Sequence, residues 1–386
     1  MVDVADIFRA VWPGYAAKFG RWIPPEQRAA VRALLRCRTP ALGGQVYRCD
    51  CGGTHYAYHS CNHRACPKCG WDDNTDWLQR QQARLLPVPY FLVTFTVPEE
   101  LREPIRSAMK VWYGALLKES AGALQDLAGQ PKHLGAELGL TSVLQTWTRD
   151  LRYHPHVHVL LPGGGLSADG LHWLRLRSAS ARQGRSKTRD YFLPQEKLAA
   201  RFKGRLKAWL QAEEPELFKR VPAKVWWRKW VVDVQAVGSG AAALKYLAAY
   251  VHRGPLHPAR LKAWDPPASG SGATSGGNVT FSYRDGAGQE RRCTVSGTEF
   301  VRRLLQHVPP KHFQRVRHFG WRAAAARAKW ERIVALLDWR APLPQPATKN
   351  PPPVLCPGCG KVMRLIGTLA RSPPGSRVKL SPRDKG

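Results

Sequence analysis

The spacing of hydrophobic and polar positions divides the chain into strand-like and helix-like segments. Residues 89–101, PYFLVTFTVPEEL, combine β-branched and aromatic side chains up to Pro98, which is typical of a strand that ends at a proline. Residues 195–211 instead repeat apolar side chains at the spacing of an amphipathic helix. By the same criteria we expect further strands at 141–149, 155–161 and 224–237, and further helices at 101–128 and 238–255. Strands separated by helices, with one pair joined by a short turn, predict an α+β fold built on an antiparallel sheet.

The other segments predict a chain of several domains. A helical stretch precedes a cysteine cluster in 1–85, and the strand and helix pattern fills 86–265. A glycine- and serine-rich linker at 266–278 leads to a hairpin, a helix and a basic segment in 279–340. The last part, 341–386, combines a proline-rich spacer, a Cys-x2-Cys pair and a basic tail that we expect to be disordered.

The net charge adds a candidate partner to this picture. The 386 residues contain 60 Lys and Arg against 28 Asp and Glu, which gives a formal charge of +32. An excess of this size, spread along the chain, favours nucleic acid over an anionic membrane or an acidic protein, although it does not separate DNA from RNA. Because no apolar run reaches ~18 residues and the first residues lack a signal-peptide layout, we expect a cytoplasmic protein that associates with the nucleoid.

Clustered cysteines indicate a zinc site near the N-terminus. Five of the nine cysteines lie close together: Cys49, Cys51, Cys61, Cys66 and Cys69. Zinc takes four thiolate or imidazole ligands, and closely spaced cysteines supply them in pairs from tight turns. Cys66 and Cys69 form the clearest pair. The other three cysteines compete for the remaining positions, with His55, His59 and His63 as outside candidates.

A second cysteine pair lies near the C-terminus, in the sequence CPGCG. Cys356 and Cys359 resemble half of a zinc knuckle, and no further pair follows them. This half-knuckle either takes ligands from elsewhere in the chain or binds no metal. Cys37 and Cys293 stand alone in the sequence.

Residues 153–165, YHPHVHVLLPGGG, suggest a different metal site. On a strand His154, His156 and His158 share one face, but the first and last are about 13 Å apart at Cα, too far to share one ion. His154 also precedes Pro155, which places it at the turn. We therefore expect His156 and His158 to be the metal pair. If the neighbouring strand pairs around residues 151–152, Gln145 lies opposite His158 as a candidate third ligand, although a one-residue slip would turn it away.

Two tyrosines on the expected helix 238–255 could supply a nucleophile. Tyr246 and Tyr250 lie at i and i+4, on the face opposite an apolar stripe of Leu244, Leu247 and Val251. This stripe can bury the helix, so core packing does not explain the tyrosines. A metal that polarises a phosphodiester would make a phenol an effective nucleophile, and the neighbouring Arg253 could stabilise developing phosphate charge.

Basic residues interleaved with aromatic rings indicate a nucleic-acid surface. In KVWWRKWVV, Trp226, Trp227 and Trp230 alternate with Arg228 and Lys229, a pattern suited to single-stranded DNA, although buried tryptophans would fit it equally well. We take Trp227, Arg228 and Lys229 as DNA-binding candidates. The later segment PPKHFQRVRHFGWR adds a further set: Lys311, Arg315 and Arg317.

Taken in order, several of these stretches resemble one known family. They are SCNHRACPKCG, FTVPEEL, LQTWTRDLRYHPHVHVLLPGGGLS, KYLAAYVHR and FVRRLLQHVPPKHFQRVRHFGW, and they cover about residues 40–325. The chain resembles the two-tyrosine, rolling-circle transposases of bacterial insertion sequences, the IS91 family of the HUH endonuclease superfamily. Gln145 stands where many relatives carry histidine.

The resemblance implies both a fold and a mechanism. It implies a ferredoxin-like domain in which His156 and His158 hold a divalent metal, Mg²⁺ or Mn²⁺; two imidazoles suit Mn²⁺ or Zn²⁺ better than Mg²⁺. It implies that Tyr246 and Tyr250 attack DNA strands in turn, leaving 5′-phosphotyrosine links and a free 3′-hydroxyl. It also implies an N-terminal zinc-binding domain that helps to recognise element ends. The alternatives are a replication initiator or relaxase with the same chemistry, and a zinc-dependent nucleic-acid-binding protein without catalysis.

Overall fold

The computed structural model describes residues 2–69, 74–175, 193–252, 254–267, 276–342 and 353–372. The chain forms two compact units, each assembled from separate stretches of sequence. The first unit contains Met1–Asp72, Arg253–Val308 and Gln345–Gly386, and the second contains Asp73–His252 and Pro309–Pro344. From the sequence, each domain was expected to be one continuous stretch of the chain. In the structure, the stretch 279–340 is divided between the two units, and residues 254–265 belong to the first unit rather than to the domain expected at 86–265.

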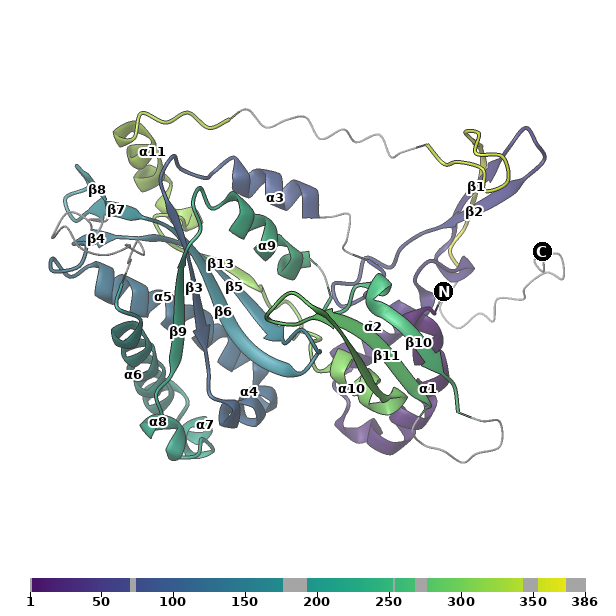
Figure 1. Ribbon diagram of the computed structural model, residues 1–386, viewed down its shortest axis with the longest axis horizontal. Helices are drawn as coiled ribbons and strands as arrows, with labels where there is room; N and C mark the ends of the chain where they lie inside the picture. Colours follow the sequence, from purple (N-terminus) through teal and green to yellow (C-terminus); the bar gives the residue numbers. More distant parts are fainter. Residues whose placement is uncertain are drawn as a thin grey trace. The chain divides into compact units, whose positions relative to one another are not determined.

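A five-stranded antiparallel sheet forms the centre of the second unit (Figure 1). Its strands, in spatial order, are β13 (Val316–Gly320), β5 (Gly139–Trp147), β6 (Tyr153–Pro162), β3 (Tyr90–Thr96) and β9 (Val231–Ala236). With α5 (Met109–Ala128) and α6 (Gln195–Glu213), the chain order is β3-α5-β5-β6-α6-β9, a βαββαβ arrangement of ferredoxin-like topology extended by β13. The α+β fold with an antiparallel sheet is therefore confirmed.

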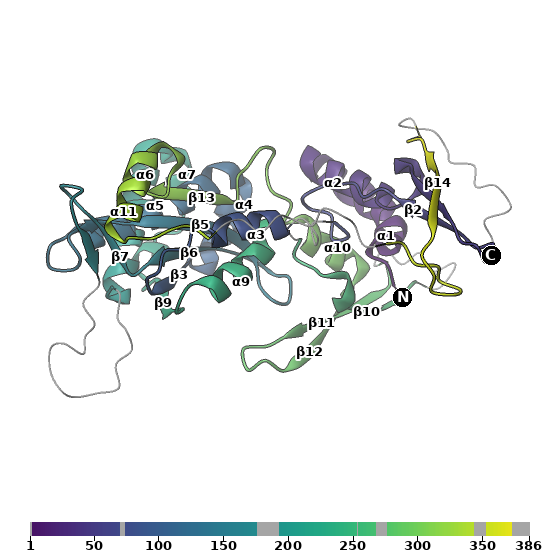
Figure 2. The same cartoon turned by 90° about the horizontal axis from the view of Figure 1, so that it is seen from above.

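Helices cover both faces of this sheet. Figure 2 shows α5 and α6 on one side and α3 (Asn74–Gln82) with α9 (Ala241–His252) on the other. Phe91, Val93 and Phe95 of β3 are buried in the core beneath α5 and α6. The alternate positions Tyr90 and Leu92 pack in a second cluster with Leu244 and Leu247 of α9. Burial on both faces explains why β3 is hydrophobic at almost every position rather than at every second one.

Several expected strands have different bounds in the structure. The strand expected at 141–149 is β5 at 139–147, because the chain turns after Trp147 and Leu151 adopts a positive φ of 67°. The segment expected as a strand from residue 224 starts with a helical turn, α8 (Lys224–Trp227), before β9. This turn lets Trp226 stack on Trp230, with ring centroids 5.9 Å apart, and both rings are buried near Phe202 of α6.

Short elements complete the second unit. They are η3 (Glu99–Leu101), α4 (Arg102–Ser107), β4 (Ala136–Glu137), β7 (Gly164–Ser167), β8 (Trp173–Arg175), α7 (Pro215–Lys219), η6 (Ala324–Ala326) and α11 (Arg327–Leu336). Strands β4, β7 and β8 form a separate small antiparallel sheet.

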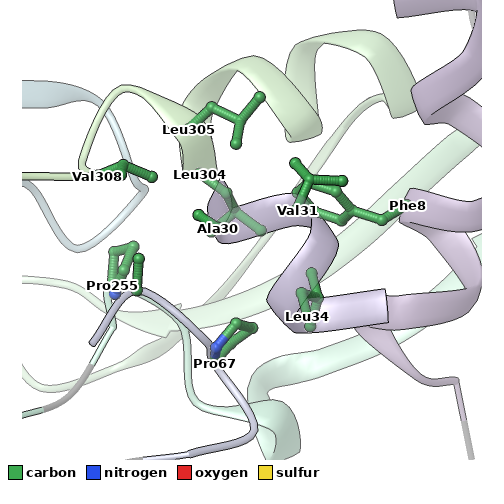
Figure 3. A pocket seen from close by; sticks show the side chains of 10 residues that line it. Phe8, Ala30, Val31, Leu34, Pro67, Pro255, Leu304, Leu305 and Val308 are labelled. Carbon is green, nitrogen blue, oxygen red and sulfur yellow. The ribbon is translucent and has the colours of Figure 1, made fainter. Parts of the chain in front are cut away.

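Three helices form the apolar centre of the first unit: α1 (Val4–Phe19), α2 (Pro25–Arg36) and α10 (Gly297–Leu305). Figure 3 shows Phe8, Val31 and Leu304, one from each helix, around a pocket lined by apolar residues. The expected hairpin at 279–295 is confirmed as β11 (Asn278–Arg284) and β12 (Glu290–Ser296), which pair with β10 (Leu261–Asp265). Short 3-10 turns occur at Gly20–Trp22, Pro40–Leu42 and Pro258–Arg260.

The C-terminal segment is part of the first unit rather than a disordered extension. Strand β14 (Arg364–Leu369) pairs antiparallel with β1 (Gly44–Arg48), and β1 pairs with β2 (Thr54–Tyr58). Disorder was expected after the Cys-x2-Cys pair, and it is wrong for β14 because the backbone of β1 offers an open edge that β14 completes. The rest of the expected spacer and tail, 343–352 and 373–386, lies outside the described residues.

Candidate functional site

Two histidines and a glutamine share the face of the second unit's sheet that α9 covers. His156 and His158 alternate with valines on β6, as the strand period requires. Gln145 of β5 pairs with His156, whereas the sequence suggested His158. The register differs by two residues because the turn lies at residues 148–152, earlier in the chain than expected, and the pairing is irregular between Gln145 and Trp147. An even shift keeps Gln145 on the same face.

Hydrogen bonds fix the orientation of these three side chains. The Gln145 amide donates from Nε2 to the Trp147 carbonyl at 3.0 Å, which turns its Oε1 toward His158 Nε2, also 3.0 Å away. His156 donates from Nδ1 to the His154 carbonyl at 2.7 Å, so that its Nε2 is the acceptor nitrogen. This pattern is typical of metal-ligating histidines, whose other ring nitrogen is held by a backbone carbonyl or a polar side chain.

Thr94 is a contact of this site that the sequence reasoning missed. Its hydroxyl lies 3.0 Å from His158 Nδ1, and Thr94 is the residue of β3 that pairs with His158. Thr94 lies two residues after Leu92, so the strand period places both on the same face of β3, and the sequence alone could show this. The sequence did not show that β3 pairs with β6.

Burial makes both histidines neutral at physiological pH. His156 is 9% and His158 6% exposed. Burial lowers the pKa of His156 to about 4 and that of His158 to about 3. Neutral imidazole is the form that binds a metal. The Gln145 oxygen and the His158 nitrogen are 3.0 Å apart, close to the spacing of about 3 Å that two ligands at about 2.1 Å adopt at a right angle.

His154 has a different environment from its two neighbours. It was expected in the turn before Pro155, but it lies within β6, because that strand starts at Tyr153. Arg102 donates from Nη2 to His154 Nδ1 at 3.3 Å. Burial, together with Arg102 and Arg152, lowers the His154 pKa. The expectation that His154 is not one of the metal pair remains a prediction.

The two tyrosines of α9 lie against the histidine pair. The His158 ring centroid is 5.8 Å from that of Tyr246 and 6.1 Å from that of Tyr250, and the two tyrosine rings are 4.9 Å apart. Tyr246 is 45% exposed, whereas Tyr250 is partly buried and packs against Trp147. The buried stripe of Leu244 and Leu247 holds α9 to the sheet, as the helical period indicated. Arg253, the third expected catalytic residue, lies outside the described residues.

The basic candidates differ in their surroundings. Trp227 is 82% exposed, whereas Trp226 and Trp230 are buried. Lys229 is exposed, and Arg228 donates to Glu100 at 2.5 Å.

The basic residues of the later segment also differ from one another in exposure. Lys311 is exposed and Arg317 is partly buried over the Phe313 ring. Arg315 is buried, with its guanidinium 5.8 Å from the Trp147 ring. The candidates therefore do not form one uniform exposed patch, since tertiary packing draws Arg315 inward.

Eight cysteines of the first unit form two separate sets. Among the described residues, the sulfur atoms within each set all lie within 4.8 Å of one another. The sets are Cys37, Cys61, Cys66 and Cys69, and Cys49, Cys51, Cys356 and Cys359. The five clustered cysteines therefore do not share one site, because β1 and β2 carry Cys49 and Cys51 away from the others.

The first set combines the expected Cys66–Cys69 pair with a cysteine that the sequence left isolated. Cys37 follows α2, and its sulfur is 3.3 Å from that of Cys69. The three neighbouring thiols hold the pKa of Cys69 far below its ordinary value, and those of Cys61 and Cys66 lower the pKa of Cys37 to about 7. The outside candidates His55, His59 and His63 belong to neither set. The arrangement fits a structural zinc ion bound by four cysteines.

Comparisons with known proteins agree with this geometry. Residues 7–97 match a family described as "Transposase zinc-binding domain", and residues 139–329 match one described as "Putative transposase". The chain is 34% identical to "Putative transposase y4qJ" of Sinorhizobium fredii (strain NBRC 101917 / NGR234), over 83% of this chain and 80% of that protein. It is 28% identical to the transposase for insertion sequence element IS801 of Pseudomonas savastanoi pv. phaseolicola, over 89% of this chain and 83% of that protein. No solved structure matches the chain.

A zinc-binding part joined to an antiparallel-sheet domain of this kind defines the protein as a DNA transposase of insertion sequences. Within that class, the chain belongs to the IS91 family, which carries an N-terminal zinc-binding domain. In the part of the chain that the structure describes, no helix combines the length and apolar character needed to span a membrane.

Proposed function

We propose that the protein nicks and rejoins single-stranded DNA at insertion-sequence ends through 5′-phosphotyrosine intermediates, as in rolling-circle transposition. The observation that carries the proposal is the packing of Tyr246 and Tyr250 against His158, on the sheet face that also presents His156 and Gln145. Nucleophile candidates and a set of metal-ligand atoms thus occur together within one unit.

The residues present fit a divalent cation. His156 Nε2, His158 Nε2 and Gln145 Oε1 would hold Mg²⁺ or Mn²⁺, which when bound polarises a phosphodiester oxygen and stabilises charge on the phosphate. Two imidazoles beside one amide oxygen favour Mn²⁺ over Mg²⁺. With a ligand at Nε2, the His158 ring carries its proton on Nδ1 and donates it to the Thr94 hydroxyl.

A tyrosine then acts as the nucleophile. The Tyr246 phenol loses its proton, its oxygen forms a bond to phosphorus, and the bond from phosphorus to the 3′-oxygen breaks, so that the released 3′-oxygen takes up a proton and becomes a free 3′-hydroxyl. Tyr250 can repeat this step on a second strand, and the released 3′-hydroxyl reverses it during rejoining. Tyr246, at 45% exposed, is the more accessible of the two to DNA.

A basic and aromatic surface supports single-stranded DNA as the substrate. Trp227 projects into solvent beside Lys229, and stacking of a base on an exposed aromatic ring is a general mode of single-strand binding. The charge of +32 supplies the attraction to phosphate that such binding needs.

The test is covalent capture. The protein is incubated with single-stranded oligonucleotides from element ends and Mn²⁺, and the products are separated on a denaturing gel. We expect a protein–DNA adduct that disappears in the Tyr246→Phe/Tyr250→Phe variant and persists in Tyr56→Phe, a control of similar exposure at 43%. An adduct that survives in the double variant would refute the tyrosine assignment. Absence of any adduct with wild-type protein would favour a non-catalytic DNA-binding role.

A replication initiator or relaxase would use the same chemistry. The similarity to insertion-sequence transposases over four fifths of each chain favours transposition. Joining of a nicked element end to a second DNA molecule distinguishes the two functions, because an initiator only nicks and recloses its own origin.

A further inference from the structure

We propose that Cys49, Cys51, Cys356 and Cys359 bind a second structural zinc ion, which fastens the C-terminal segment to the N-terminal β-hairpin. The region that matches the zinc-binding family, residues 7–97, contains only the first two of these ligands. The other two follow the proline-rich spacer. The site would therefore close the first unit by joining two distant parts of the chain.

The distances between the sulfur atoms fit a metal rather than disulfides. Cys49 and Cys359 are 3.4 Å apart at sulfur, and Cys51 lies 3.6 Å from both Cys356 and Cys359. A disulfide requires about 2.05 Å. Four thiolates at about 2.3 Å from a tetrahedral zinc ion lie about 3.8 Å from one another, close to what is seen.

Each half of the site is a tight turn of the kind that zinc knuckles use. In the first turn the Gly52 amide donates to the Cys49 carbonyl at 2.9 Å, and Gly52 has a φ of +90°. In the second the Gly360 amide donates to the Cys356 carbonyl at 2.8 Å, and Gly360 has a φ of +72°. Both positions favour glycine, since other residues are strained at positive φ. The two pairs therefore present their sulfurs from similar turns.

Backbone donors surround the Cys356 sulfur at the second turn. The backbone N–H groups of Cys359 and Gly358 donate to this sulfur. Gly53 lies against the same four cysteines, because a Cβ there would be in van der Waals contact with the Cys356 sulfur at 3.4 Å and with that of Cys51 at 3.7 Å.

In the part of the chain that the structure describes, the surrounding sheet has a small apolar core. Strand β14 pairs with β1 from Gly44 to Arg48, yet Leu365 is 53% and Ile366 is 50% exposed. Among the described residues, the apolar cluster beside these strands consists of Cys49, Cys356 and Met363, with Tyr47 and Val354 packed against it. A small sheet with so small a core is a setting in which zinc binding supplies folding energy. In Figure 1 the yellow C-terminal segment lies beside β1 and β2, where such a fastening would act.

The test measures zinc content in the full-length protein. We expect two zinc ions per chain by elemental analysis, one in Cys356→Ser/Cys359→Ser, and two in the control Cys293→Ser, whose sulfur belongs to neither set. Cys66→Ser/Cys69→Ser should remove the other ion. One zinc in the wild type together with an unchanged value in Cys356→Ser/Cys359→Ser would overturn the proposal. Fewer than nine free thiols after denaturation without reductant would also overturn it, since the link would then be a disulfide.

A second measurement covers the case in which a variant folds poorly. Zinc should protect the Arg364 and Lys361 peptide bonds in wild-type protein from trypsin. Chelation, or the Cys356→Ser/Cys359→Ser substitution, should expose them while the second unit remains resistant. Equal cleavage at these bonds with and without zinc, in protein of unchanged circular dichroism, would contradict a metal fastening.

Discussion

Replacing Thr94 with valine tests how the histidine pair is positioned. Thr94 contacts His158 Nδ1 at 3.0 Å, and the opposite nitrogen of the same ring faces Gln145 at 3.0 Å. Valine has nearly the same shape as threonine but lacks the hydroxyl. The substitution therefore leaves Nδ1 of a ring that is only 6% exposed without its partner, and the ring loses one of its two polar contacts.

The magnitude follows from the cost of a buried, unpaired polar group. That cost is about 1–3 kcal/mol, and each 1.4 kcal/mol corresponds to about tenfold in a binding constant. Loss of a group that orients a metal ligand typically weakens metal binding by about 10–100-fold, which lies within the same range. We expect Mn²⁺ affinity to fall by about that factor in Thr94→Val.

The assay is Mn²⁺ binding by calorimetry, with thermal unfolding measured on the same samples. Thr141→Val is the matched control: Thr141 lies 3.1 Å from His318 Nδ1 on the same face of the sheet, but away from the candidate ligands. It should lose stability while keeping Mn²⁺ affinity. Unchanged Mn²⁺ affinity in folded Thr94→Val, or an equal loss in Thr141→Val, would refute the positioning role.

Three further predictions concern other parts of the second unit. Trp227→Ala should weaken single-stranded DNA binding by about 1–3 kcal/mol without lowering the unfolding temperature, because the ring is 82% exposed. Fluorescence anisotropy with a labelled oligonucleotide measures the affinity, and a variant that binds as tightly as wild type would argue against stacking on Trp227. Arg205→Ala should reduce the free energy of unfolding, measured by urea titration, by about 3 kcal/mol, because it removes the guanidinium that lies 2.9 Å from the buried Glu119 carboxylate. A loss well under about 1 kcal/mol would show that water replaces the guanidinium. Burial lowers the pKa of His318 to about 4, so the unfolded state binds a proton more readily than the folded state. The free energy of unfolding should therefore be unaffected by this group above about pH 6.5 and should fall between about pH 6.5 and about pH 4, by at most about 1.4 kcal/mol per pH unit. His318→Gln should flatten this pH dependence in urea titrations.

Local periodicity was sufficient to predict which side chains share a face. The strand period placed His156 and His158 together, and the helix period separated Tyr246 from the buried stripe of Leu244 and Leu247. These inferences hold because they depend only on backbone geometry within one element. The α+β fold was predictable for the same reason, since each strand and helix carries its own pattern.

Contacts between different strands and helices could not be predicted from the sequence and became known only from the folded structure. Gln145 pairs with His156 rather than with His158, because the position of a turn and an irregularity in pairing set the register, and neither leaves a clear pattern in the sequence. Thr94 reaches His158 only because β3 lies next to β6, although 64 residues separate the two in sequence. Arg315 looked like a surface cation and is buried beside Trp147.

The cysteines show most clearly what the sequence determined and what the tertiary structure decided. The sequence predicted zinc at the N-terminal cluster and left open whether Cys356 and Cys359 bind metal, since short spacing and flanking glycines are local properties. The structure decided how they divide: Cys37 joins the pair at Cys66 and Cys69, and the half-knuckle at Cys356 and Cys359 meets the turn at residues 49–51. A zinc site needs four sulfurs within a few ångströms, and only the folding of distant segments brings them there.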